Sequence, residues 1–384
     1  MTSSDPVYFD NNATTPLDPR VLEVMHSAWR TAFANPGSQH SFGRTARQVL
    51  EDSREQIAEI LDADPAEVIF TSGGTESLNT AIRGFTLGRR GLVGLTAGEH
   101  PATREACQYA TASGLQLTEL PVTPTGLLDQ SALQQLAWSD LRLCAVILAH
   151  NETGVIQDIS LLSELCSRHG VPLLLDAVQA VGKLDFSFRQ SGAAAVAFGA
   201  HKFHGPRGIG GLLLRRGLRI PALLVGGHQE SGRRAGTEPV PLAAGMAAAL
   251  RLWHAERRER QQRMAAVRDR LAAGLHELCA PIVIHGAAAP RLPNTLNVAF
   301  PGISGEALLV NLHLAGVACS LGSTCASGSV EPAPVLLAMG IPESLCLSSV
   351  RFSMSYLNTE QEVEQALPRI AAAVARLRSG EVRR

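Results

Sequence analysis

Short apolar runs alternate with stretches of helical spacing between residues 68 and 175. This alternation predicts βαβ units, in which parallel strands form a sheet that helices cover on both faces. Two shorter apolar runs at residues 194–198 and 211–214 predict two more strands, closer together in sequence. The pattern therefore indicates an α/β fold with a mostly parallel central sheet. The first five predicted strands are Val68–Phe70, Leu92–Leu95, Leu115–Leu120, Ala145–Leu148 and Val171–Leu175.

The sequence changes character on both sides of this alternation. Two helical patterns, Pro19–Phe33 and Gly43–Asp62, precede it. From Pro241 to Leu278 an Ala-, Arg-, Glu- and Gln-rich stretch is typical of one long helix or two abutting helices. We expect a large domain of residues 13–255 and a smaller α+β domain of residues 1–12 with 256–384. Its predicted elements are strands at Thr295–Phe300 and Ser349–Met354 and helices at Glu306–Leu314, Pro334–Met339 and Thr359–Arg378.

Charge and cysteine usage exclude several classes of protein. A formal net charge of −1 gives no electrostatic reason to expect nucleic acid or an anionic membrane as a partner. No apolar run approaches the roughly 20 residues that span a bilayer, and the first residues lack a secretory pattern. The seven cysteines are scattered along the sequence and do not form a disulfide framework. They predict reduced thiols in a cytoplasmic protein.

Chemically distinctive side chains follow five of the predicted strands, at the point where each strand ends. In open α/β sheets ligands bind beyond the carboxyl ends of the strands, so we expect these side chains to converge. Each of them alone is equally compatible with a plain turn, a helix cap or a surface residue. The five groups are Gly74 with Thr75, then His100, Asn151, Asp176 with Gln179, and His201 with Lys202.

Together these groups indicate one kind of chemistry, which none of them indicates alone. Backbone N–H groups and the Thr75 hydroxyl at a helix start can cradle a phosphate. Asp176, after three leucines, needs a cationic or hydrogen-bonded partner if it is buried. A partly desolvated Lys202 is easier to deprotonate and more nucleophilic. These are the requirements of pyridoxal phosphate, over whose ring His100 can shuttle protons.

Two competing sites have less support. His201 and His204 could form a metal pair, but no carboxylate or cysteine lies at ligand spacing around them. The GPRGIGG segment resembles a dinucleotide loop, but it precedes a predicted strand instead of opening a helix after one.

A second distinctive stretch, residues 318–332, is rich in Ser and Gly and predicts a mobile loop. It carries Cys319 and Cys325. Cys325 lies among small polar residues, which favours an exposed, nucleophilic thiol, whereas Cys319 follows apolar residues that favour burial. A Cys319–Cys325 disulfide and two incidental thiols are the alternatives. The other five cysteines lie in helical or strand patterns that favour a packing role.

Seven motifs in order make the sequence similar to cysteine desulfurases of the NifS/IscS type, within the class-V aminotransferase group of fold-type I pyridoxal-phosphate enzymes. The resemblance runs from YFDNNATTPLDPRV at residues 8–21 to VRFSMSYLNTEQE at 350–362. It implies a homodimer that converts L-cysteine to L-alanine and passes sulfur to an iron–sulfur scaffold or another acceptor protein. The motifs are FTSGGTESLN, EHPA, HNETGVIQDI, DAVQAVGK, AHKFHGPRGIG, GRRAGTE and GSTCASGS.

The resemblance also implies a role for individual residues. Lys202 matches the Schiff-base lysine, Asp176 the partner of the pyridine nitrogen, and Cys325 the nucleophile that becomes a persulfide and could transiently ligate an iron–sulfur cluster. Arg351 matches the clamp for the substrate carboxylate, assisted by Asn35. Gln179 and Asn151 match the residues that contact the ring hydroxyl, and His100 matches the acid/base stacked on the ring. Gly74, Thr75 and His201 match residues that contact the phosphate, and Thr237 matches one that contacts the phosphate in the other subunit.

Two positions depart from the family pattern. Gly199 stands where the family often has a serine that contributes to the phosphate site, and the cysteine loop reads LGSTC where SGSAC is common. The loop is nevertheless of the Ser/Gly type of the NifS/IscS branch. A selenocysteine lyase or a class-V aminotransferase is the alternative within this fold, and a catalytically silent sulfur-carrier or scaffold subunit is the alternative of another class.

Overall fold

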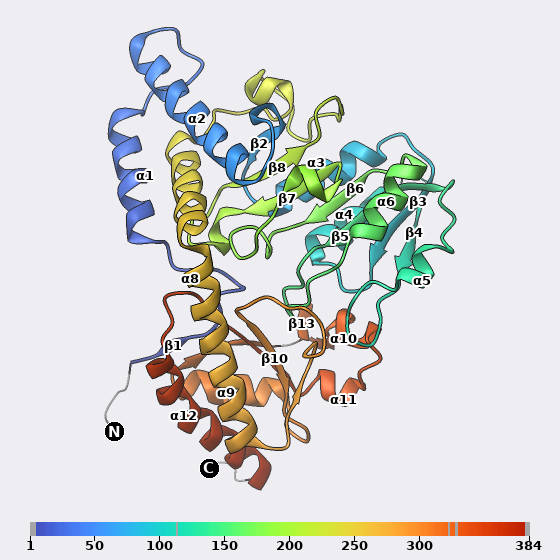
Figure 1. The fold of residues 1–384 in the computed structure, drawn as a ribbon, viewed down its shortest axis with the longest axis vertical. Coiled ribbons are helices and arrows are strands. Elements are labelled where there is room, and N and C mark those ends of the chain that lie inside the picture. The colour runs from blue at the N-terminus through green and yellow to red at the C-terminus, as the bar shows by residue number, and fades with distance from the viewer. Residues whose placement is uncertain (1–4, 113, 322, 327–328, 381–384) are drawn as a thin grey trace.

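A seven-stranded sheet forms the centre of the computed structural model, which describes residues 5–112, 114–321, 323–326 and 329–380 (Figure 1). The strand order is β2-β8-β7-β6-β5-β3-β4. β8 runs antiparallel to both of its neighbours, and the other pairs in the sheet are parallel. The strands are β2 (Val68–Thr71), β3 (Gly91–Thr96), β4 (Leu115–Leu120), β5 (Leu141–Ile147), β6 (Leu173–Asp176), β7 (Ala195–Gly199) and β8 (Gly210–Leu214).

Helices cover both faces of this sheet. Successive residues of a strand point to opposite faces, so Leu174 joins the cluster under α3 and α4, whereas Leu175 joins the cluster under the helices of the other face. That second cluster also contains Leu50 of α2 and Leu250 of α8. The covering helices are α1 (Pro19–Thr31), α2 (Ser41–Ile60), α3 (Gly74–Thr86), α4 (Pro101–Thr111), α6 (Ser160–His169) and the first part of α8 (Val240–Cys279).

The rest of the chain packs around a separate apolar cluster. Its sheet has the order β12-β15-β10-β9, and α8 and α12 pack against it through buried residues such as Leu271 and Ile370. Figure 1 shows α8 running from the central sheet down to α12. The elements are β9 (Val283–Ile284), β10 (Thr295–Ala299), α9 (Gly305–Leu314), β12 (Ser320–Leu321), α10 (Pro334–Ala338), α11 (Glu343–Cys346), β15 (Ser349–Ser353) and α12 (Glu360–Ser379).

The N-terminal segment lies with this second part of the chain. β1 (Val7–Tyr8) pairs in parallel with β11 (Val317–Ala318), and Asp10 forms a bridge with Ser353. Residues 11–18 then cross to the central sheet, where Thr15 N donates to His201 O. The segment therefore links both parts of the molecule next to the end of β7. Two short helices, α5 (Gln130–Leu133) and α7 (Phe188–Ser191), complete the fold.

The α/β fold class is confirmed, with strand and helix bounds close to those predicted. The domain division at residues 13–255 stays a prediction, since α8 continues through residue 255 without a break. The expectation of a mobile loop at residues 318–332 stays a prediction. Within this stretch the described residues include β12 and an antiparallel pair, β13 (Ser323–Ala326) and β14 (Ser329–Pro332). No helix among the described residues is long and apolar enough to cross a membrane.

Candidate active site

A cavity of about 470 Å³ opens where the strands of the central sheet end. Nine of the predicted site residues line it, and they come from five different strand ends and from β15 of the smaller sheet. The structure therefore brings together side chains that lie as far as 277 positions apart. The nine are Gly74, Thr75, His100, Asn151, Asp176, Gln179, His201, Lys202 and Arg351.

The start of α3 offers unoccupied backbone donors to this cavity. Its N-cap residue, Gly73, has no side chain to accept the first N–H groups of the helix. A Cβ on Gly74 would lie 2.6 Å from Cγ2 of Val178, so only glycine fits there. An anion at this helix end meets free N–H groups, the positive end of the helix dipole and the Thr75 side chain.

Asp176 ends β6 at the floor of the cavity and is only 3 % exposed. Its Oδ1 accepts from Val178 N at 3.0 Å. Burial raises the pKa of Asp176 to about 6, although this bond and Lys202 favour the ionised form. The site thus holds a carboxylate that a cationic ligand would stabilise.

Lys202 follows β7 on a single turn of 3₁₀ helix, Ala200–Lys202. Its Nζ donates to the carbonyl oxygens of Asn12, at 2.6 Å, and Ala13, at 2.8 Å. Desolvation, with a further contribution from Arg351, lowers the pKa of Lys202 to about 8. The amine is therefore easier to deprotonate than an ordinary lysine, as Schiff-base chemistry requires.

His100 caps α4 and lines the cavity. Its Nδ1 accepts from Ala102 N at 3.1 Å, so the neutral ring carries its proton on Nε2. Desolvation by the surrounding protein and repulsion by Lys202 lower the pKa of His100. His201, on the other side, places Nδ1 3.1 Å from Thr14 Oγ1.

Arg351 projects from β15 and is 6 % exposed. Nη1 donates to Glu152 Oε1 at 2.8 Å, and Nη2 donates to Asp10 Oδ1 at 3.0 Å. Nε has no partner among the described residues. Asn151 donates to the same Glu152 oxygen at 2.8 Å, so the predicted ring contact and the predicted substrate clamp share one carboxylate.

The sequence analysis missed three polar residues of this site. Asn12, 2 % exposed, donates to Asn151 O and Thr295 Oγ1 and so ties the central sheet to β10. Glu152 follows Asn151 directly in the HNETG motif, which is the signal that could have identified it. Lys183 ends the DAVQAVGK motif. The segment after Asp176 forms consecutive turns at residues 178–183, and these direct both Gln179 and Lys183 inward.

Three predicted residues lie outside the described lining of this cavity. Asn35 is exposed between α1 and α2, where its side chain accepts from Gly37 N. Thr237 is also exposed. Cys325 lies in β13 opposite Val330, and Figure 1 draws β13 between the central sheet and the smaller sheet. The Cys325 side chain is outside the described part of the structure. The roles of these three residues stay predictions.

The segment that carries Thr237 is anchored by a buried ion pair. Glu230 accepts from both terminal nitrogens of Arg54 at 2.8 Å, and its Oε2 also accepts from Phe70 N. Both side chains are less than 10 % exposed. The pair connects the loop to α2 and β2, and Thr237 lies exposed further along this segment.

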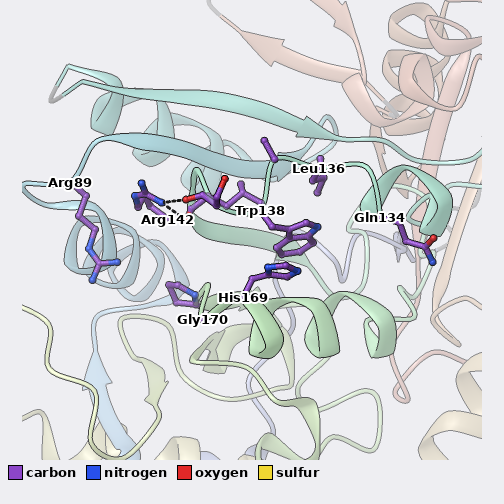
Figure 2. Close-up of a pocket in the computed structure, with 11 residues that line it drawn as sticks. Arg89, Gln134, Leu136, Trp138, Arg142, His169 and Gly170 are labelled. Atoms are coloured by element: carbon purple, nitrogen blue, oxygen red, sulfur yellow. Dashed lines mark hydrogen bonds between the residues drawn. The ribbon is translucent and has the colours of Figure 1, made fainter.

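A different pocket lies near the opposite ends of the strands, between β5 and the end of α6 (Figure 2). Trp138 and His169 stack there with ring centroids 5.2 Å apart. The Arg142 guanidinium already donates to the carbonyl oxygens of Arg90, Ser139 and Leu141. The donors of this guanidinium are thus already bound by backbone carbonyl groups. Among the described residues, no group of three or more His, Cys, Asp or Glu side chains could hold a metal ion.

Comparisons with known proteins agree on one family. The class-V aminotransferase family model matches residues 7–366. A protein of Enterobacter agglomerans named cysteine desulfurase is 42% identical over 380 residues, covering 97% of this chain and 94% of the relative. The cysteine desulfurase NifS of Azotobacter vinelandii is 39% identical over 378 residues, covering 97% of this chain and 94% of the relative. A solved structure described as a NifS-like protein superposes with a TM-score of 0.89 at 34% identity, covering 96% of this chain and 99% of that one.

Proposed function

We propose that this chain, which belongs to the class-V aminotransferase family, is a pyridoxal-phosphate-dependent cysteine desulfurase. The substrate is L-cysteine and the products are L-alanine and a persulfide on Cys325. The observation that carries the proposal is the convergence of Lys202, Asp176 and the uncapped start of α3 on one cavity. Near-full-length relatives named cysteine desulfurase support the choice among reactions of this family.

The residues of the cavity fit the cofactor. Gly74 stands where a Cβ would clash with Val178, so the backbone at the start of α3 stays open, and its N–H groups lack a side-chain cap. Burial makes Asp176 costly to ionise, and a positively charged pyridinium nitrogen beside it would stabilise its carboxylate. Lys202 supplies a partly deprotonated amine for a Schiff base. When bound, pyridoxal phosphate supplies an electron sink for the bonds at the substrate Cα.

Each side chain then has a task. Lys202 would hold the cofactor through its amine, and His100, which lines the same cavity, would hold or move a proton there. Arg351 binds the substrate carboxylate, for which its unpartnered Nε is available. The Cys325 thiolate attacks the substrate sulfur, so an S–S bond forms as the C–S bond breaks. The carbon takes up a proton and leaves as alanine.

The proposal includes partners that complete the cycle. We propose a homodimer in which Thr237 of each subunit contacts the phosphate in the other, with Asn35 assisting Arg351. The Cys325 persulfide passes its terminal sulfur to a thiol of an iron–sulfur scaffold or another acceptor, with Cys325 as a transient cluster ligand in the first case. The scattered, unpaired cysteines support a reducing, cytoplasmic setting.

Covalent mapping tests this function directly. The chain has only two lysines, Lys183 and Lys202, so borohydride reduction of the cofactor-loaded protein followed by peptide mass spectrometry has two possible outcomes. We expect the reduced pyridoxyl group on Lys202, and its absence after Lys202→Ala. Incubation with cysteine should add about 32 Da, the mass of one sulfur atom, to the Cys325 peptide. A Cys325→Ala protein that binds the cofactor and still releases alanine at the wild-type rate would exclude the persulfide mechanism.

A selenocysteine lyase is the second candidate, because the same cavity accepts the selenium analogue of the substrate. Comparing alanine yields from cysteine and selenocysteine, in wild type and Cys325→Ala, separates the two. A lyase retains activity toward selenocysteine without the thiol, whereas a desulfurase loses activity toward cysteine.

A further inference from the structure

Lysine is used in only two places in this chain. Of the 34 basic residues counted as Lys or Arg, two are lysines and the rest are arginines. Arginine stays charged in proteins, whereas lysine becomes neutral when it is desolvated. Both lysines, Lys183 and Lys202, border one small enclosed space behind the candidate active site. The chain therefore has lysine where a neutral amine can form, and Lys183 has no role in the mechanism given so far.

The Lys183 amine donates hydrogen bonds to two side-chain amide oxygens. Lys183 is 3 % exposed, and its Nζ donates to Asn12 Oδ1 at 3.0 Å and to Gln179 Oε1. Asn12 O in turn accepts from Lys202 Nζ at 2.6 Å and from Gln179 Nε2 at 2.9 Å. Lys183, Gln179, Asn12 and Lys202 thus form one continuous network of hydrogen bonds.

The surroundings of Lys183 favour the neutral amine. Among the described residues no carboxylate forms an ion pair with it. The titratable groups around it are basic, except for the Tyr356 phenol after β15, whose raised pKa keeps it neutral. The basic groups are Lys202, His201 and His204 after β7, Arg260 of α8, and Arg351 of β15. Burial first, and then Lys202 and Arg351, hold the pKa of Lys183 well below its ordinary value. A neutral amine has two hydrogens, which matches the two acceptors.

The backbone is built to bring Lys183 to this position. Gly182 has φ +78°, a conformation that disfavours other residues, and a Cβ there would lie 2.2 Å from Cβ of Phe203. The turn that carries Lys183 therefore packs directly against the residue that follows Lys202. Gln261 of α8 closes the other side, where its Nε2 donates to the Lys183 carbonyl oxygen at 2.8 Å.

We propose that Lys183 is a positioning residue that acts through Gln179, to whose Oε1 its amine donates. An amide can be turned by 180° with little change in shape, and only one orientation presents N–H groups to the cofactor ring. The Lys183 amine fixes Gln179 Oε1 behind the cavity, so Nε2 faces forward. One Nε2 hydrogen reaches Asn12 O and the other remains for the ring oxygen. This inference rests on the proposed function, since it assigns a support to one contact of the same site.

The experiment compares Lys183→Met and Lys183→Arg in the cofactor-loaded protein. A donor to the ring oxygen stabilises its anion and lowers the basicity of the Schiff-base nitrogen. Lys183→Met should therefore raise the pH midpoint of the visible absorption band by about 0.5–1 unit and weaken cofactor binding by about five- to tenfold. Lys183→Arg retains donors but adds a permanent charge, so it should lower the midpoint instead of restoring it.

Two further comparisons separate positioning from packing. Gln261→Leu disturbs the same turn without touching the amine, and its midpoint should equal that of wild type. In a Gln179→Leu background, Lys183→Met should shift the midpoint by less than about 0.2 unit, because the two residues act in series. A full shift in that background, or an unchanged midpoint in Lys183→Met, would overturn the inference. If Lys183→Met does not fold, Lys183→Leu, which also lacks a donor, gives the same comparison.

Failure of this inference and failure of the proposed function look different. If wild type gives no pyridoxyl adduct on Lys202, the function itself is wrong. If wild type gives the adduct and Lys183→Met retains the wild-type midpoint and affinity, only the role of Lys183 is wrong.

Discussion

Nη1 of Arg351 lies 2.8 Å from Oε1 of Glu152, inside the cavity where the substrate carboxylate is proposed to bind. Asp10 holds the other terminal nitrogen at 3.0 Å, and it also accepts from Ser320 Oγ at 2.7 Å, in the strand just before the cysteine hairpin. The substrate clamp therefore already has two anionic partners. A third carboxylate must compete with them.

Glu152→Gln removes one of these competing charges and should lower the KM for cysteine. The amide oxygen can still accept from Arg351 and Asn151, so the geometry is retained while the negative charge is lost. We expect KM to fall by about three- to tenfold at pH 7.5, with a smaller change in kcat, because like charges at close range in a buried site repel strongly. Steady-state alanine production measures both constants.

Glu256→Gln is a suitable control for this variant. It removes a carboxylate from a more exposed pair with Arg20, away from the cavity, and should leave KM unchanged. A higher KM in Glu152→Gln would mean that Glu152 supports substrate binding and does not compete with it.

The part of the site that sequence could predict is the part that strand ends determine. His100, Asp176 and Lys202 each follow a buried run, and the topology of a parallel sheet brings such ends together whatever the intervening loops are. The partners of Arg351 could not be found in this way. Asp10 reaches it because β1 pairs with β11, and Glu152 because its turn packs against β15, and these are contacts between segments about 200 to 340 positions apart.

Lys183 and Gln179 illustrate a second limit. The segment that carries them forms consecutive turns in which Gly182 has a positive φ. What a lysine at this position contacts depends on how closely Phe203 packs against that glycine, and packing distances of this kind have no local signature in the sequence.

Gly199→Ser should strengthen cofactor binding. Gly199 ends β7 with φ −138°, a conformation open to any residue, and a Cβ there would lie 3.5 Å from Gly74 N and 3.7 Å from the His201 ring. These are ordinary contacts, so a serine fits beside the uncapped start of α3. One added hydroxyl donor to the phosphate should tighten pyridoxal-phosphate binding by about three- to tenfold.

Fluorescence titration of the cofactor-free protein measures this affinity. Gly199→Ala, which adds the Cβ without the hydroxyl, is the matched control and should bind like wild type. Equal affinities of the serine and alanine variants would show that the phosphate does not come within reach of position 199.

Asp176→Asn should stabilise the cofactor-free protein while it abolishes turnover. Burial raises the pKa of Asp176 from 3.8 in the unfolded reference to about 6 in the folded protein. The folded state therefore binds the proton more tightly, and the stability that this group contributes is present below pH 3.8 and lost as the pH rises through 6. Above that window the buried carboxylate costs at most about 3 kcal/mol, which the amide does not.

Urea unfolding of the cofactor-free variants checks the sign of this difference in the free energy of unfolding. Asp176→Asn should be more stable than wild type at pH 7.5, and the difference should shrink toward pH 4. Asp62→Asn should behave in the opposite way, because hydrogen bonds from Ser187 and Arg189 lower the pKa of Asp62, so its contribution is present at neutral pH and lost as the pH falls. If Asp176→Asn is instead less stable than wild type at pH 7.5, Asp176 is stabilised as a structural carboxylate, and its assignment to the pyridine nitrogen loses its physical basis.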